Sequence, residues 1–474
     1  MLPSSTQQPA GLLAGTGRCD ITPAPGTPQG GWGAQLHERG SEADMHLLVT
    51  ALALASGSER FLIVEADAIG FNAEWTNKIL ETIEQLTGVA RSNIRFSCSH
   101  THSGPNTFRV ANISTGLDMI TSYLESLPLR IASAAWQAVQ QMEPARLACS
   151  TGECFINRSR RVRSPAGEVI VGVDEDAPAD HALGVLRLDR HDGSTLATLL
   201  HYACHPTTIG WQSDRFTPDY PGPARAEVER AVGGHCLFLQ GAAGDLGPRR
   251  GFTGDVAVYR RLGEELGLAA ASIAMSLDPL HRTQRFTSVM PSGANIAQYE
   301  YDPHPANDTC RMMSRSLDLP IKQLPPQEEI ARDLEQLRAQ VQQARDAGDL
   351  QSMQRLQAKA TQMGWRLENS RLYAGKATTR WPMQVMRLGD IALVSMAGEP
   401  FSSIAQRIRE SSPARHAFVS GYSNGGFGYI PDRKAHEEGG YEVEATPFAA
   451  EAADIVVREA LEVLNELFQE QKSK

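Results

Sequence analysis

The chain has 474 residues, of which 41% are hydrophobic and 21% are charged, so it can bury a large core as soluble globular proteins do. A formal net charge of −10 without basic blocks argues against a nucleic-acid partner. No run of about 18 apolar residues occurs, so we expect no membrane insertion. The seven cysteines are scattered and the first residues lack a signal-peptide pattern, which predicts reduced thiols and a cytoplasmic location.

Short apolar runs alternate with longer amphipathic runs in the first 280 residues. The apolar runs predict buried strands at 60–71, 92–99, 194–206 and 235–241. The amphipathic runs predict helices at 72–88, 119–142, 219–234 and 255–277, the second interrupted at Pro128. This alternation predicts an α/β fold with helices layered on sheet.

From about residue 325 the composition becomes rich in Gln, Arg, Ala and Glu. Apolar residues at helical spacing, with a turn at 346–349 and Asp349 as N-cap, predict an inserted helical hairpin at about 327–372. The hairpin could pack on its own domain or offer a coiled-coil surface to a partner. The pattern spans few heptads, which favours the first interpretation.

Strands are predicted again at 383–400 and 416–431, with a helix at 401–411 between them and a final helix at 448–471. Linkers and internal repeats are absent from the sequence. We therefore expect one domain over residues 1–474.

Polar residues follow several of the apolar runs, where strands of α/β proteins end and sites gather. These residues are His100, His102, His205, Asp245, Glu399 and Tyr429. Histidine and carboxylate are the usual ligands of catalytic zinc, whose bound water ionises near neutral pH. Residues i and i+2 of an extended chain point to the same side, so both histidines of the HTH segment should face one cavity.

Each of these residues also has an ordinary structural interpretation. The histidines could be core residues, Glu399 could begin a helix, Tyr429 could pack and Asp245 could belong to a turn. An HxH pair also occurs in TIM-barrel amidohydrolases. The chain lacks eight regular βα units and the later Lys, His, His and Asp set, so that fold is disfavoured.

Seven segments, taken together and in order, resemble the neutral/alkaline ceramidase family. They are GRCDITPAPGTPQGGWG (17–33), SCSHTHSGPN (97–106), INRS (156–159), ACHPTT (203–208), QGAAGDLGP (240–248), AGEPF (397–401) and SNGGFGYIPDRKAHEEGGYEVEAT (423–446). The resemblance implies a layered sandwich of two mixed β-sheets flanked by helices, with the hairpin inserted.

The resemblance also implies roles for individual residues. A zinc ion would be held by His100, His205, Glu399 and Tyr429. His102 and Tyr441 would be catalytic, the first handling a proton and the second stabilising the reacting carbonyl oxygen. Arg158 would be both catalytic and substrate-binding, and Asp245 would bind the substrate.

Two features depart from the family pattern. Gly247 stands where the family has an active-site serine, so a serine nucleophile is excluded there. The immunoglobulin-like domain that follows in the family is not found in this sequence. We therefore expect a small, water-soluble substrate and poor hydrolysis of long-chain ceramide.

The predicted function is zinc-dependent hydrolysis of a carbonyl bond, most readily the amide of a soluble N-acyl compound. An esterase or lactonase, or a hydrolase of glycosidic bonds, would use the same residues. The non-enzymatic alternative is a metal-stabilised binding protein. The oligomeric state is not predicted.

Overall fold

Two mixed β-sheets form the centre of the molecule. The computed structural model describes residues 11–469, apart from residues 36, 109–112, 114, 279–281, 304–307 and 426–427. The larger sheet has eight strands in the order β10 (His235–Gln240), β9 (Thr195–Tyr202), β8 (Ala182–Arg190), β5 (Glu143–Glu153), β1 (Leu13–Asp20), β2 (Leu48–Ser56), β3 (Glu59–Ala66), β4 (Ile94–Cys98). The smaller has four, in the order β14 (Cys310–Pro320), β15 (Thr378–Leu388), β16 (Ile391–Met396), β18 (His416–Ser420).

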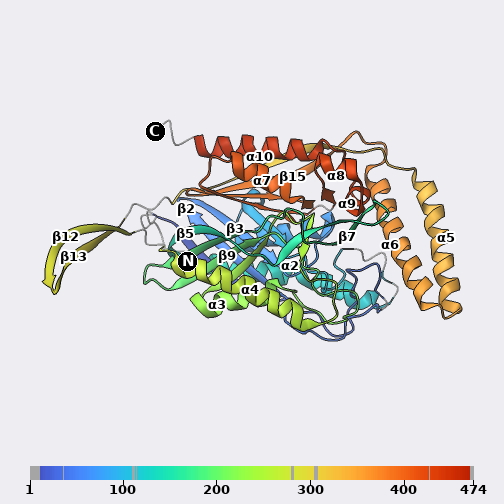
Figure 1. The fold of residues 1–474 in the computed structure, drawn as a ribbon, viewed down its shortest axis with the longest axis horizontal. Helices are drawn as coiled ribbons and strands as arrows, with labels where there is room; N and C mark the ends of the chain where they lie inside the picture. The colour runs from blue at the N-terminus through green and yellow to red at the C-terminus, as the bar shows by residue number, and fades with distance from the viewer. Residues whose placement is uncertain are drawn as a thin grey trace.

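The two sheets pack face to face, and helices cover their outer faces. Phe61 and Leu186 of the larger sheet share one buried cluster with Leu393 and Phe418 of the smaller. Helices α1 (Ala73–Thr87), α2 (Leu117–Gln140), α3 (Pro221–Val232) and α4 (Val256–Ser276) cover the larger sheet. Helices α7 (Ser402–Ser411) and α10 (Ala452–Gln469) cover the smaller one (Figure 1). This arrangement confirms the predicted layered α/β sandwich.

Three parallel strand pairs position the site. They are β3–β4, β9–β10 and β16–β18, joined by α1, α3 and α7 respectively. The larger sheet curls so that its edge strand β10 contacts β2, β3 and β4. A short bridge from Ser97 to Ser423 joins the end of β4 to the segment after β18, and one from Gly241 to Ser420 joins the end of β10 to the last residue of β18. Strand ends that are far apart in the sheet order therefore meet.

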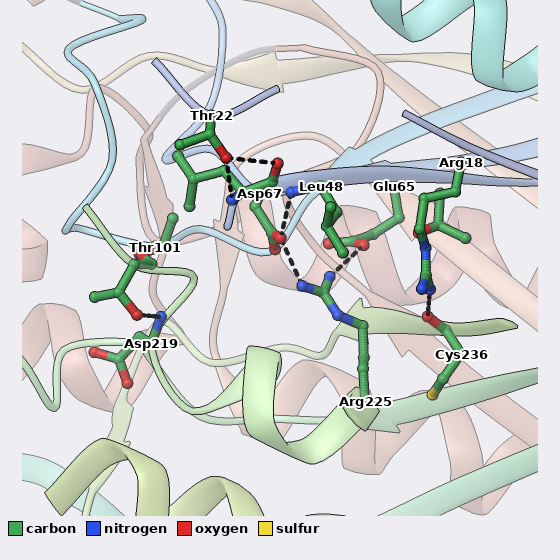
Figure 2. A network of polar contacts seen from close by, with 12 residues as sticks. Arg18, Thr22, Leu48, Glu65, Asp67, Thr101, Asp219, Arg225 and Cys236 are labelled. Carbon is green, nitrogen blue, oxygen red and sulfur yellow. Dashed lines mark hydrogen bonds and ion pairs between the residues drawn. The ribbon is translucent and has the colours of Figure 1, made fainter. Parts of the chain in front are cut away.

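A buried ion network locks α3 to the end of β3. The Arg225 guanidinium donates to Glu65 Oε2 at 3.0 Å and to Asp67 Oδ2 at 2.5 Å. Figure 2 shows the arginine reaching from its helix between the two carboxylates. Asp67 Oδ2 also accepts the backbone N–H of Leu48, at 2.9 Å. The network thus anchors the chain just before residues 68–70, which border the site.

Helix α2 differs from the sequence prediction, because it runs through Pro128 without interruption. Proline removes one helical hydrogen bond and crowds the preceding turn, at a cost of about 3 kcal/mol. Pro128 is buried, and so are Leu124, Leu127 and Ile131 around it. Packing of this apolar face on the larger sheet offsets the local cost.

The predicted hairpin is present as α5 (Gln327–Asp346) and α6 (Leu350–Tyr373), with the Asp349 side chain capping α6. Ile330, Leu334, Ala360 and Leu367 form its own small core. The hairpin stands at one end of the molecule (Figure 1), where Gln354 Nε2 of α6 donates to the carbonyl of Ala34 at 2.9 Å. It packs on its own chain, as the favoured interpretation of the sequence holds.

The remaining elements are small. β11 (Leu246–Pro248), β6 (Asn157–Arg163) and β7 (Val169–Asp174) form a three-stranded sheet, and β17 (Glu399–Pro400) pairs with β19 (Tyr429–Ile430). Three short helices, η1 (Arg91–Asn93), α8 (Arg433–Glu438) and α9 (Tyr441–Ala445), complete the helical elements. β12 (Arg282–Ser292) and β13 (Ala294–Pro303) form a ribbon that projects at the end opposite the hairpin (Figure 1). Among the described helices, none has the length and apolar character to cross a membrane.

Candidate metal centre

The HTH segment begins two residues after β4 and turns sharply at His100. This residue has φ +68°, in the left-handed region that non-glycine residues rarely adopt. Its N–H donates to the carbonyl of Ala68 at 2.9 Å, which ties the turn to the end of β3. His102 Nε2 lies 3.4 Å from His100 Nε2. Both histidines therefore meet as predicted, but through a left-handed turn, so the extended-chain reason for the prediction is wrong.

His205 and Glu399 come from two other strand ends. His205 follows β9, and its Nε2 lies 3.1 Å from His100 Nε2. Glu399, in β17, places Oε2 at 3.5 Å from His100 Nε2 and 3.2 Å from His205 Nε2. Tyr429 is the direct β-partner of Glu399, and its ring stacks on His205 with centroids 6.5 Å apart. Four segments distant in sequence thus converge.

Backbone carbonyls set the tautomer of all three imidazoles. The Nδ1 atoms of His100, His205 and His102 lie 2.6, 2.9 and 3.1 Å from the carbonyl oxygens of Ile69, Ala243 and Gly31. Each Nδ1–H donates there, so each Nε2 presents a lone pair. Metal-ligating histidines are held by the same type of contact. Three lone pairs and a carboxylate that face one another form a set of donors that can hold a cation between them.

The donor distances fit a zinc ion. Zinc binds nitrogen and oxygen at about 2.0–2.2 Å in a tetrahedron, which places its ligand atoms about 3.3 Å apart. The three distances among His100, His205 and Glu399 are 3.1, 3.2 and 3.5 Å. Glu399 Oε2 is buried without a hydrogen-bond partner within the described residues, as a metal ligand would be. The nitrogens of all three histidines lie within 4.8 Å of one another.

Two histidines of the cluster, His205 and His102, are neutral at physiological pH. Burial, with the nearby charge of Arg160, lowers the pKa of His205 to about 3. Burial also lowers the pKa of His102 well below its usual value. Neutral imidazole is the form that binds a metal, so ligation needs no proton to be displaced from these nitrogens near pH 7.

The cluster lies at a cavity of about 570 Å³. Five of the predicted site residues line it: His100, His102, Glu399, Tyr429 and Tyr441. His205, also predicted, lies behind them against Tyr429. Helices α5 and α6 line it too, so the hairpin forms part of the pocket.

Three aromatic or basic residues at the centre have no role in the sequence analysis. Trp32 packs on His102 with ring centroids 4.9 Å apart, and Tyr422 packs on His100 at 4.2 Å. The buried guanidinium of Arg160 lies 5.2 Å from the centroid of the Tyr429 ring. Trp32 sits in a glycine-rich segment and Arg160 two residues after Arg158. These two sequence features were the signals that could have pointed to Trp32 and Arg160 as site residues.

Arg158 lies outside the lining of the cavity, which does not favour its predicted role at the substrate. Its Nε donates to Glu175 at 2.8 Å and its Nη1 to the carbonyl of Phe155 at 3.0 Å. A bulge in the β6–β7 pairing, between Ser159 and Arg161, breaks the strand's regular alternation. Arg160, rather than Arg158, is therefore the arginine next to the candidate metal centre.

Asp245 is also placed away from the lining of the cavity. One carboxylate oxygen accepts the N–H of Ser402 and the other accepts its hydroxyl, both at 2.7 Å, so the side chain caps α7. Burial raises the pKa of Asp245 to about 6. This arrangement favours the turn interpretation over substrate binding.

Gly247 lies in β11, opposite Arg158 of β6. A Cβ built at Gly247 would meet only the side chain of Arg160, at 3.5 Å, so the space there admits a small side chain. The glycine is thus not required by packing.

Known proteins are similar to this chain in sequence and in fold. The family model described as "Neutral/alkaline non-lysosomal ceramidase, N-terminal" matches residues 12–250. Neutral ceramidases B and A of Dictyostelium discoideum are 25% and 24% identical over 212 and 213 residues, which is 41% of this chain and 29% of each relative.

Two solved structures share the fold. The crystal structure of neutral ceramidase from Pseudomonas aeruginosa matches with a TM-score of 0.68 and 18% identity, covering 98% of this chain and 75% of that one. A second, "Ceramidase complexed with C2", matches with a TM-score of 0.66 and 17% identity, over 98% and 76% of the two chains. The family model spans half of the sequence, and the chain belongs to the neutral/alkaline non-lysosomal ceramidase family.

Proposed function

We propose that this protein is a zinc-dependent hydrolase that cleaves the amide bond of an N-acyl lipid. The observation that carries the proposal is the convergence of three imidazole Nε2 atoms and Glu399 Oε2 at one cavity. A zinc ion held there would supply a Lewis acid and a water molecule that ionises near neutral pH.

The chain's own residues supply the rest of the reaction. His102, held at Nδ1 by the Gly31 carbonyl, directs Nε2 to the centre and can take up and return a proton. Tyr441 lines the same cavity, with its ring centroid 5.6 Å from that of Tyr429, and can donate to the carbonyl oxygen as charge develops on it. Trp32 and the hairpin line the cavity around these groups and exclude water from them.

The comparisons favour a lipid substrate over the small soluble compound predicted from sequence. The relatives are named ceramidases, and ceramide is an N-acyl lipid. The matched segments cover 29% of the curated relatives. We propose from this likeness that the chain also acts on an N-acyl lipid.

The test is hydrolysis by zinc-loaded protein of ceramide in mixed micelles, a soluble short-chain amide, and an ester and a lactone of matched acyl length. We expect turnover of the micellar amide, with about one zinc per chain. His100→Ala and His205→Ala should lose zinc and activity together, while the exposed His191→Ala should keep both. Full zinc retention by both site variants would refute the metal centre, and turnover of the ester or lactone alone would refute the amidase.

A further inference from the structure

The hairpin contributes two kinds of surface to the cavity. Helix α6 contributes uncharged residues to the lining, among them Met353, Ala360 and Trp365. From α5 come Arg338, Val341 and Arg345. Their spacing of three and four residues places these last side chains on one helix face. A cationic stripe on α5 therefore faces the cavity beside an uncharged wall from α6.

The two arginines have no ion pair or side-chain hydrogen bond within the described part of the chain, although carboxylates lie nearby on the same helix. Glu335 is three residues before Arg338, and the structure records no ion pair between them. Asp346 accepts instead from Gln342, at 2.7 Å. Glu38, an acidic residue of the lining, accepts from the Thr115 hydroxyl at 2.6 Å. The guanidinium groups are thus available to a ligand.

Both arginines line the cavity and are exposed at the surface, so they lie at its rim. On α6 the lining extends from Met353 to Trp365, twelve residues or about 18 Å of helix. Trp365, at the inner end, packs on Tyr441 with centroids 5.7 Å apart. Arg345 is one residue before the end of α5, at the hairpin turn. The cavity therefore has buried candidate metal ligands in its interior, uncharged α6 residues along one wall, and a cationic rim.

We propose that this rim makes the protein selective for anionic N-acyl amphiphiles, whose carboxylate or phosphate is bound by Arg338 and Arg345. The planar guanidinium fork matches both anions in bidentate geometry. The inference rests on the proposed amidase function. In that reaction water adds to the amide carbonyl, the C–N bond breaks, the nitrogen leaves with a proton as the amine, and the anionic group is unchanged.

The test compares three probes of equal acyl length: N-lauroylglycine, N-lauroyl ethanolamine and its O-phosphate. The variant Arg338→Gln/Arg345→Gln should lose about tenfold or more in kcat/KM on the anionic probes, with little change on the neutral one. The control Arg332→Gln/Arg355→Gln removes the same charge from exposed hairpin positions outside the lining and should behave like wild type. Comparison of the glycine and phosphate probes identifies the preferred anion.

Binding followed by intrinsic tryptophan fluorescence, to which Trp32 and Trp365 of the lining contribute, separates this inference from the amidase proposal. If no probe is hydrolysed but N-lauroylglycine binds more weakly to the Arg338→Gln/Arg345→Gln variant than to the control, anion binding by the rim is supported and the amidase proposal is refuted. Equal losses in both double variants, or a wild-type preference for the neutral probe, would overturn the rim.

Discussion

Gly31 holds His102 through its carbonyl and leaves no room for a side chain. A Cβ at Gly31 would lie 2.3 Å from the carbonyl oxygen of His102, closer than any real contact. Gly31→Ala should therefore shift the histidine and lower turnover by about 10²-fold, as a misplacement near 1 Å does elsewhere. Steady-state kinetics on the amide substrate measures the loss.

Gly33 supplies the matched control for that substitution. A Cβ at Gly33 meets only side chains and backbone of α6 at 3.5 Å or more, which is ordinary contact. Gly33→Ala should keep wild-type turnover. Equal rates for the two variants would show that the position of His102 does not limit the reaction.

The role of His102 is separable from metal binding. If His102 handles a proton and is not a ligand, His102→Ala should retain zinc and lose about 10²–10⁴ in kcat, the usual contribution of a general acid–base group. Zinc content and kcat measured on the same preparation test this, with His205→Ala as the metal-free reference. Loss of zinc in His102→Ala would make it a ligand, which the 3.4 Å distance between His102 and His100 also permits.

At the scale of elements, the contact between α3 and β3 makes stability depend on pH. Burial raises the pKa of Glu65 to about 8, with Arg225 opposing the shift and Asp67 adding to it. The folded state then binds more protons than the unfolded state between about pH 4.5 and 8. The contribution of Glu65 to stability is complete below this window and falls, as pH rises, by about 1.4 kcal/mol per unit.

Glu65→Gln should remove this dependence, because the amide keeps the shape but does not ionise. We expect the free energy of unfolding of the variant, relative to wild type, to rise between pH 5 and pH 8 in urea titrations. Glu74→Gln, at an exposed position in the first turn of α1, should follow wild type. Parallel curves for Glu65→Gln and wild type would show that Glu65 is ionised throughout.

For the whole molecule, a metal ion would link four segments that are distant in sequence. Its ligands meet only in the folded state, so binding should stabilise that state by RT ln(1 + [L]/Kd), about 2.7 kcal/mol at a hundredfold excess over Kd. Zinc should raise Tm and a chelator should lower it. Calorimetry checks both.

Two histidine variants test whether the change in Tm comes from zinc at this site. His205→Ala should show no response of Tm to zinc, whereas the exposed His191→Ala should respond as wild type does. An equal rise in all three proteins would place the stabilising zinc elsewhere on the chain.

The sequence by itself determined the long helices, the strands that lead to the site, and the chemistry at the ends of those strands. Apolar runs predicted the strands before His100 and His205, and helical spacing with the Asp349 cap predicted the hairpin, because these signals are local. It assigned no element to β1, β2, β5 and β8, which make up half of the larger sheet, or to β14 of the smaller one. It also assigned none to β12 and β13, whose side chains have little core to face. The single domain and the cytoplasmic location stay predictions.

Only the tertiary structure decided which of these ends meet. The curl of the larger sheet brings β10 against β4, and a bulge places Arg160 rather than Arg158 at the centre. Docking of α6 on residue 34 makes the hairpin a wall of the cavity. The hydrophobic periodicity of one segment predicts which of its residues are buried, but it does not predict which other segment they pack against. Sheet curvature, strand register and helix docking arise from packing between segments that are far apart in the chain.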